Sequence, residues 1–187
     1  YELLGIHAIE QIEKDPYILI DIARGVDFKQ IDKMALDLGI SYDNDKRIRS
    51  GIKYALIRAT YNGHACVLKE NLIQFVISLL DVMTENIEDG LIELRANDEI
   101  VIEERNDGTG IWIYLSNFYY TEQEIAIRIK RLQEASNVKE IKNIQTILKK
   151  IESHSNIELS EKQKEAIELV NENNVTIITG GPGTGKT

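Results

Sequence analysis

The sequence predicts a mainly α-helical chain with one small β-hairpin, followed by the start of an α/β domain. Apolar residues recur at helical spacing through most of its 187 residues. Two runs rich in β-branched and aromatic residues flank an Asp-Gly turn, which is typical of a β-hairpin. Near the end, a β-branched run leads directly into a glycine-rich loop. These changes of pattern divide the chain into segments 1–43, 44–116, 117–156 and 157–187.

Segment 1–43 has the pattern of a helix-hairpin-helix. Asp15 and Pro16 end a first helical stretch and begin another, since proline is favoured in the first turn of a helix. A tight turn at residues 24–27 follows, and a second helix is expected from residue 28 to residue 38. Gly39 is a natural end for that helix, because the position after a helix favours a residue that accepts a positive φ.

Segment 44–116 has the element order of a winged-helix domain. The apolar spacing predicts three helices and one short extended piece, with the helices at 46–62, 69–80 and 84–96 and the extended piece at 65–68. Two strands are then expected at 99–104 and 110–115, joined by a turn that contains Asp107 and Gly108. Three helices closed by a β-hairpin make this segment winged-helix-like.

The last two segments are a helical connector and the start of an α/β domain. Segment 117–156 is expected to form a long amphipathic helical stretch with a break near Ser136. In segment 157–187, Ser160 is a candidate N-cap, and Gln163 three residues later completes a capping-box pattern. The elements expected after this cap are a helix and a short buried strand, at 161–171 and 175–179.

A phosphate-binding loop motif follows the expected strand directly. Every constrained position of G-x-x-x-x-G-K-[ST] is met by the run Gly180, Gly181, Pro182, Gly183, Thr184, Gly185, Lys186 and Thr187. Glycines let several backbone N–H groups turn toward a triphosphate and approach it closely. Lys186 would place its charge at the β- and γ-phosphates, and Thr187 would offer its hydroxyl to Mg²⁺. Lys186 and Thr187 are therefore the candidate catalytic residues.

Gln163 is a candidate for recognising the base of the nucleotide. It precedes the phosphate loop on the helix that leads into the expected strand. One carboxamide offers an acceptor and a donor together, which match the N6 donor and the N7 acceptor of adenine. The pattern therefore predicts ATP rather than GTP as the bound nucleotide, together with Mg²⁺.

Several short runs of the chain carry a resemblance to a known family. The run Leu-Ser-x-x-Gln-x-x-Ala-Ile at 159–167 and the loop at 177–187 are similar to a Q-motif and a motif I. Upstream pieces of the same kind are Asp15-Pro16-Tyr17-Ile18-Leu19, Gly25-Val26-Asp27-Phe28, Ala35-Leu36-Asp37-Leu38-Gly39-Ile40, Arg47-Ile48-Arg49-Ser50-Gly51-Ile52, Tyr54-Ala55-Leu56 and Gly63-His64. Together these runs resemble the RecD-like helicases of DNA helicase superfamily 1.

This resemblance implies a motor that uses ATP and Mg²⁺ and has a RecA-like domain beginning in segment 157–187. Its implied partners are single-stranded DNA, or DNA with a 5′ overhang, and the remainder of the helicase motor, with movement from 5′ to 3′. Tyr1 is no initiator residue and Thr187 falls at the start of an expected helix, so we expect a fragment of a longer protein. Because the other motor motifs would lie after residue 187, the fragment alone is expected to be inactive.

The charge pattern limits where DNA could bind. The net charge of −9 argues against a nucleic-acid interface over the whole surface. Segments 41–63 and 117–156 are net positive, and the candidate DNA-binding residues lie on one expected helix of the first: Lys46, Arg47, Arg49, Lys53 and Arg58. No apolar run is long enough to cross a membrane and no leader pattern is present, so we expect a cytoplasmic protein, monomeric and without a membrane partner.

Two alternatives stay open at this point. Asp27 stands where the family's hairpin has its second glycine, and the third expected helix carries Glu85, Glu88, Asp89 and Glu93. Negative charge at both places opposes a DNA phosphate. Residues 1–156 could therefore be a protein-docking module with little DNA affinity, attached to a phosphate-loop ATPase. The second alternative is a phosphate-loop ATPase that is not a helicase.

Overall fold

A computed structural model describes residues 5–22, 25–135 and 141–185 of the chain. Its internal contacts divide the chain into two compact units, Tyr1–Thr121 and Glu122–Thr187. We call them unit 1 and unit 2 and describe each by itself. Across the described ranges, no helix is both long and apolar enough to cross a membrane.

Unit 1 begins with the helical hairpin that the sequence predicts. Its elements are η1 (Gly5–His7), α1 (Ala8–Lys14), α2 (Ile18–Ile22) and α3 (Phe28–Asp37). The Asp27 side chain caps α3 by accepting a hydrogen bond from the backbone N–H of Lys29 at 3.1 Å. Gly39 follows α3 with a φ of +92°, which confirms its expected role at the end of this helix.

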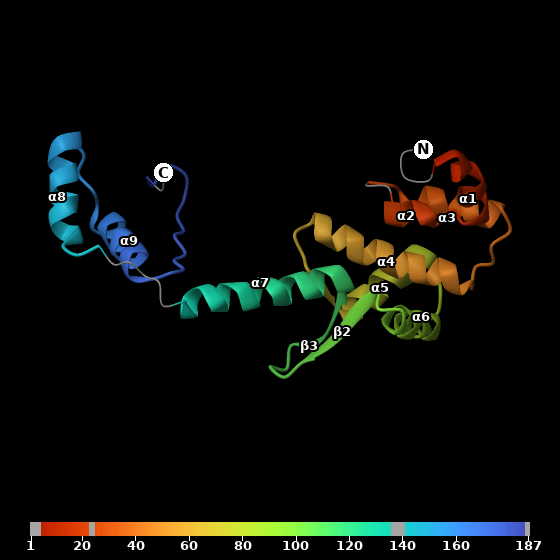
Figure 1. The fold of residues 1–187 in the computed structure, drawn as a ribbon. Coiled ribbons are helices and arrows are strands. Elements are labelled where there is room, and N and C mark those ends of the chain that lie inside the picture. Colours follow the sequence, from red (N-terminus) through yellow and green to blue (C-terminus); the bar gives the residue numbers. More distant parts are fainter. Residues whose placement is uncertain (1–4, 23–24, 136–140, 186–187) are drawn as a thin grey trace. The chain divides into compact units, whose positions relative to one another are not determined.

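The rest of unit 1 contains the three predicted helices and the predicted hairpin (Figure 1). The elements are α4 (Asp45–Tyr61), β1 (Cys66–Leu68), α5 (Lys69–Leu80), α6 (Thr84–Ala96), β2 (Ile100–Arg105) and β3 (Gly110–Leu115). The sheet is antiparallel with strand order β1-β3-β2. The extended piece at 65–68 thus adds a third strand to the expected hairpin, with Val67 opposite Ile113.

One hydrophobic core runs through the whole of unit 1. The cluster of buried residues extends from Tyr17 and Phe28 in the hairpin segment to Ile113 in the sheet. Two glycines let the helices approach closely. A Cβ on Gly51 would lie 2.7 Å from Leu80 Cδ1, and a Cβ on Gly90 would lie 3.0 Å from Ile52 Cδ1. Segments 1–43 and 44–116 share this core, and their separation into two domains stays a prediction.

A buried ion pair joins the hairpin segment to the helices after it. Arg47 is 2% exposed and Asp32 is 8% exposed. Arg47 Nε and Nη2 donate to the two carboxylate oxygens of Asp32, each at 2.8 Å. The same guanidinium donates to the carbonyls of Tyr42 at 2.7 Å and Leu80 at 3.1 Å. Tyr17 donates its hydroxyl to Asp32 at 2.7 Å, and burial together with this bond raises the pKa of Tyr17.

The described part of unit 2 contains two helices after the end of α7. Helix α7 (Ser116–Glu134) begins in unit 1, and α8 (Ile144–Ser155) and α9 (Glu161–Glu172) follow. The expected break near Ser136 lies outside the described residues. Ser160 caps α9 and Gln163 completes the capping box, as the sequence predicts.

The strand expected at 175–179 does not form, which corrects the sequence prediction. This stretch has no regular secondary structure, and it forms no ladder with another described segment. Ile177 is 85% exposed and Ile178 is 51% exposed. A strand needs a neighbour for its backbone N–H and C=O groups. The described part of unit 2 offers none, so the β-branched pattern alone does not produce a strand.

We predict that Arg47→Met strongly destabilises unit 1. The substitution leaves the Asp32 carboxylate buried without its ionic partner, and breaking a buried pair in this way costs about 3–5 kcal/mol. Arg49→Met is the matched control, because it makes the same change on the same helix at a more exposed pair with Glu93. Its cost should stay below about 1 kcal/mol. Urea unfolding followed by circular dichroism measures both, and equal losses would contradict this account of Arg47.

Candidate functional site

The glycine-rich loop follows α9 at the end of the described chain. Gly183 has a φ of +77° and Gly185 a φ of +71°, which are backbone conformations that glycine adopts without strain. Thr184 Oγ1 donates to the carbonyl of Gly181 at 2.8 Å and closes a small turn. The catalytic candidates Lys186 and Thr187 lie outside the described residues.

The structure brings Gln163 and the glycine-rich loop together. Gln163 Oε1 accepts from the backbone N–H of Ser160 at 2.8 Å, which is one half of the capping box. Its Nε2 donates to the carbonyl of Thr184 at 3.4 Å. A Cβ on Gly185 would lie only 2.5 Å from Gln163 Nε2. Glycine at this position therefore permits the close approach of the loop to the amide.

A pocket of about 690 Å³ lies between α9 and the loop. The α9 side contributes Leu159, Ser160, Lys162, Gln163, Ala166, Ile167 and Val170, and the loop side contributes Ile178, Thr179, Gly180, Thr184 and Gly185. The volume falls within the range of small-molecule sites. Most of the lining is apolar, and its polar groups include the amide of Gln163 and the ammonium group of Lys162. This composition suits a flat heterocycle attached to an anionic group.

Glu152 of α8 holds the beginning of α9 in place. Its Oε1 accepts from the backbone N–H of Leu159 at 2.9 Å and lies 3.3 Å from Lys164 Nζ. The bond from Leu159 and then the Lys164 ammonium lower the pKa of Glu152. Because Leu159 immediately precedes the cap of α9, this contact helps to fix the helix that carries Gln163.

The structure removes Arg47 from the candidate DNA-binding residues. Its guanidinium is buried and bonded to Asp32 and to two backbone carbonyls, so it cannot reach a phosphate without unfolding this part of unit 1. The sequence indicated a basic helix but could not show that one of its cations faces inward. The signal that could have found it is the apolar stripe of the same helix, since Ile48 and Ala55 flank the buried side.

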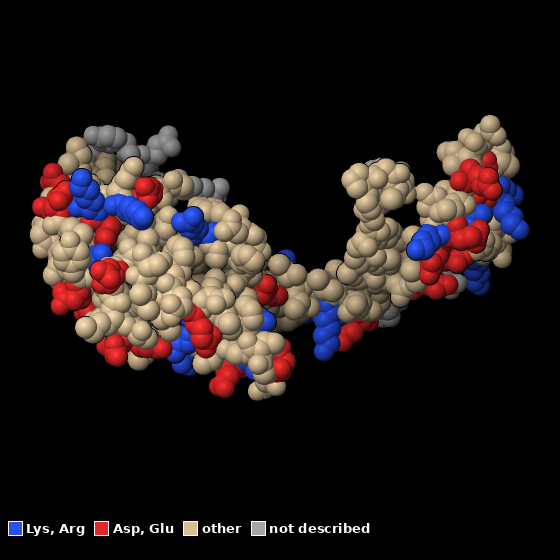
Figure 2. Space-filling model, turned by 180° about the vertical axis from the view of Figure 1, so that it is seen from behind, with Lys and Arg blue, Asp and Glu red and all other residues tan. Residues whose placement is uncertain are grey.

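Three further candidates on α4 are paired with carboxylates. Lys46 Nζ lies 2.7 Å from Asp15 Oδ2, and Lys53 Nζ lies 2.7 Å from both Asp21 and Glu99. Arg49 pairs with Glu93 of α6. On the face of unit 1 that Figure 2 shows, acidic and basic side chains are interspersed. Whether these cations contact DNA stays a prediction, but each would have to leave an acidic partner to do so.

Arg58 differs from the other four candidates. Among the described residues it has no carboxylate within ion-pair distance, and its guanidinium lies 5.8 Å from the ring centre of Phe75.

Asp27 has a structural role that the sequence reasoning missed. It caps α3, and Asp followed by a helical pattern is the signal that could have shown this.

Comparisons with known proteins agree with the resemblance found in the sequence. Residues 1–66 match the family model described as the ATP-dependent RecD2 DNA helicase HHH domain. The chain is 25% identical over 191 residues to the ATP-dependent RecD2 DNA helicase of Deinococcus radiodurans, an alignment that covers 97% of this chain and 26% of that protein. Residues 1–66 are therefore similar to the HHH domain of RecD2 helicases, and the chain as a whole is distantly similar to the N-terminal region of RecD2 helicase. It spans about a quarter of the length of this curated relative.

We predict a pH-dependent contact between α8 and α9. Because the folded-state pKa of Glu152 is lowered from 4.5, its contribution is present above pH 4.5 and is lost as the pH falls through the lowered value. The NMR chemical shift of the Leu159 amide proton should change as the Glu152 carboxylate is protonated. Glu152→Gln keeps an acceptor but cannot titrate, so the transition should disappear. An unchanged titration in this variant would assign it to another group.

Proposed function

We propose that this chain is the front part of an ATP-dependent DNA helicase that moves 5′ to 3′ on single-stranded DNA. In this proposal Gln163 and the pocket beside it take the adenine, and residues 180–187 hold the phosphates. Thr187 would contribute its hydroxyl to Mg²⁺, and ATP would supply the phosphoryl group whose hydrolysis drives movement. The similarity to a RecD2 helicase over 97% of the chain supports this class of motor.

The observation that carries the proposal is the contact between the Gln163 amide and the glycine-rich loop. A carboxamide has two N–H donors and two lone pairs on its oxygen. The capping box uses one lone pair, and Thr184 uses one N–H. One acceptor site and one donor therefore remain, which are the groups that match adenine N6 and N7. Gln163 can cap its helix and bind adenine at the same time.

Lys186→Ala in the full-length protein should abolish ATP hydrolysis and DNA unwinding. The substitution removes the charge that neutralises the β- and γ-phosphates, and we expect at least a 100-fold loss. Steady-state phosphate release with and without single-stranded DNA measures this loss. A matched control is Lys149→Ala, which removes a cation from an exposed position of α8 that does not line the pocket and should leave hydrolysis unchanged. Unchanged ATP hydrolysis by the Lys186→Ala variant would contradict the proposed ATPase site.

The isolated 187 residues should not hydrolyse ATP on their own. In the proposed motor, the carboxylate that holds Mg²⁺ and the arginine that stabilises the transition state come from later motifs. The assay compares this chain with the full-length protein at equal concentration. Robust turnover by the chain alone would show that the active site is completed within it.

A second candidate function is a protein-docking module with little affinity for DNA. The ion pairs of Lys46, Arg49 and Lys53 favour it, because they neutralise most of the basic surface of α4. Asp27 also favours it, since its carboxylate already accepts from the first turn of α3, where a phosphate would otherwise bind. In this function, unit 1 would contact the motor or another protein through surfaces other than α4.

A salt titration separates this candidate from a DNA-binding unit. If unit 1 only docks on protein, single-stranded DNA should bind the 187-residue chain weakly at low salt and with almost no salt dependence. Asp27→Asn keeps the cap but removes its charge, and it should change nothing. Micromolar binding that falls steeply with salt, or a severalfold gain from Asp27→Asn, would exclude the docking-only function.

A further inference from the structure

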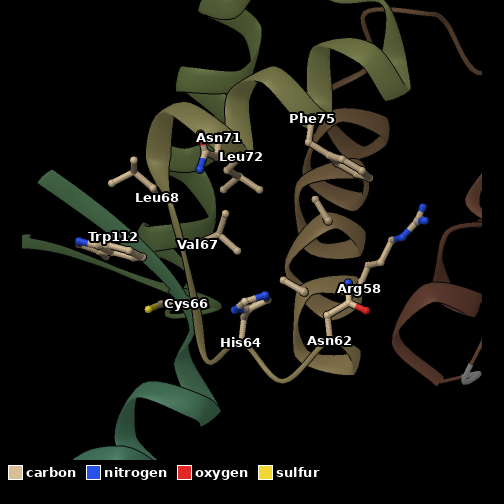
Figure 3. A pocket seen from close by; sticks show the side chains of 12 residues that line it. Arg58, Asn62, His64, Cys66, Val67, Leu68, Asn71, Leu72, Phe75 and Trp112 are labelled. Atoms are coloured by element: carbon tan, nitrogen blue, oxygen red, sulfur yellow. The ribbon is translucent and has the colours of Figure 1, made fainter. Parts of the chain in front are cut away.

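Unit 1 contains a second pocket, with a volume of about 470 Å³. Its lining residues lie between positions 55 and 112, well before the glycine-rich loop in the sequence. It is formed by the C-terminal half of α4, the strand β1, the first turns of α5 and one residue of β3. Figure 3 shows Phe75 and Trp112 on opposite sides of it, with Val67 and Leu72 between them. Small residues of α4, Ala55 and Ala59, also line it.

Polar groups of this pocket are free to bind a ligand. The side chains of Asn62, His64 and Asn71 make no hydrogen bond to any described residue, and all three residues are exposed. Two amides and an imidazole provide both donors and acceptors. Polar side chains of this kind can bond the edges of a nucleobase.

Arg58 gives the pocket its charge. It lines the pocket and is the α4 candidate without an ionic partner among the described residues. The fold neutralises the other cations of this helix with nearby carboxylates, as shown for Lys46, Arg49 and Lys53. A guanidinium left unpaired beside an aromatic ring suits one anionic group, and phosphate is an anion that arginine binds well.

Two aromatic rings make the pocket suited to a planar ligand. Phe75 is half-buried and offers a ring next to Arg58. Trp112 is held in place, because its Nε1 donates to Thr109 Oγ1 at 3.1 Å and Arg105 lies 4.5 Å from its ring centre. Aromatic rings with nearby arginines are the usual platforms on which proteins stack unpaired bases.

From these observations we infer that this pocket takes one unstacked base of single-stranded DNA, with the adjoining phosphate at Arg58. The inference rests on the proposed helicase function, which brings a single strand to this protein. One base with one phosphate matches Arg58, the one Lys or Arg residue that lines the pocket, which has no ionic partner among the described residues. An acidic peptide fits less well, because its carboxylates could use only Arg58 and would leave the two aromatic rings and the free amides of the pocket without a planar polar ligand.

The chain has its own reporter for this test, since Trp112 is its only tryptophan. A thymidine oligonucleotide and dTMP are titrated into the 187-residue protein while tryptophan fluorescence is followed. Thymine lacks the adenine pattern expected to bind Gln163, which keeps the two sites apart. We expect saturable quenching by the oligonucleotide, weaker quenching by dTMP, and a salt dependence that corresponds to about one phosphate.

Substitutions then locate the bound base. Arg58→Gln should weaken binding about fivefold and remove most of the salt dependence. Phe75→Leu should weaken it about tenfold through lost stacking. Arg128→Gln makes the same charge change on α7 and should alter neither value. Phe75 packs partly into the core, so its variant is compared only if its thermal unfolding midpoint is unchanged. Arg58 is exposed, so its substitution should leave the fold intact.

Three results would overturn the inference. They are no change of Trp112 fluorescence with DNA, quenching that Arg58→Gln leaves intact, and tighter binding of an acidic peptide than of the oligonucleotide at the same pocket. The proposed function fails separately. If full-length protein shows DNA-stimulated ATP hydrolysis while Trp112 is silent, the helicase proposal survives and the pocket assignment does not.

Discussion

The bidentate pair between Arg47 and Asp32 is the constraint on which unit 1 depends. A buried guanidinium is tolerated only when its charge and its N–H groups are satisfied. Here the partners come from three places along the chain, since Asp32 lies on α3, Tyr42 in the following loop and Leu80 at the end of α5. The hairpin segment therefore cannot move independently of the helices after it without exposing this charge. A module that looks separable in the sequence is fixed in place by one side chain.

The same principle changes how the basic helix is understood. Five cations on one helix indicate a nucleic-acid surface when the sequence is considered alone. In the fold, Asp15 after α1 and acidic residues of α2, α3 and α6 lie against α4, so positive charge in the sequence does not become positive potential at the surface. Of the five α4 cations, Arg58 is the one for which the described residues provide no carboxylate partner. It lies between aromatic and amide side chains and not on a flat basic face.

Local chemistry made much of the fold predictable from the sequence. The helix limits follow from residues such as Asn44, which caps α4, and Gly63, whose φ is +84°. The β2-β3 hairpin follows from its Asp-Gly turn. Contacts between distant residues were not predictable. Arg47 and Asp32 are separated by a loop, and no local pattern shows that their side chains meet. The strand at 175–179 failed for the same reason, because strand formation depends on a neighbour and not on composition.

Gln163 shows where local and distant constraints meet. The capping box was predictable because Ser160 and Gln163 lie one helical turn apart. Its contact with Thr184 depends on the loop folding back over α9. Because the cap already fixes the Gln163 side chain, a nucleotide would not have to order it, and less conformational entropy would be lost on binding. Gln163, in the first turn of α9, is thereby fixed beside the glycine-rich loop before a nucleotide binds.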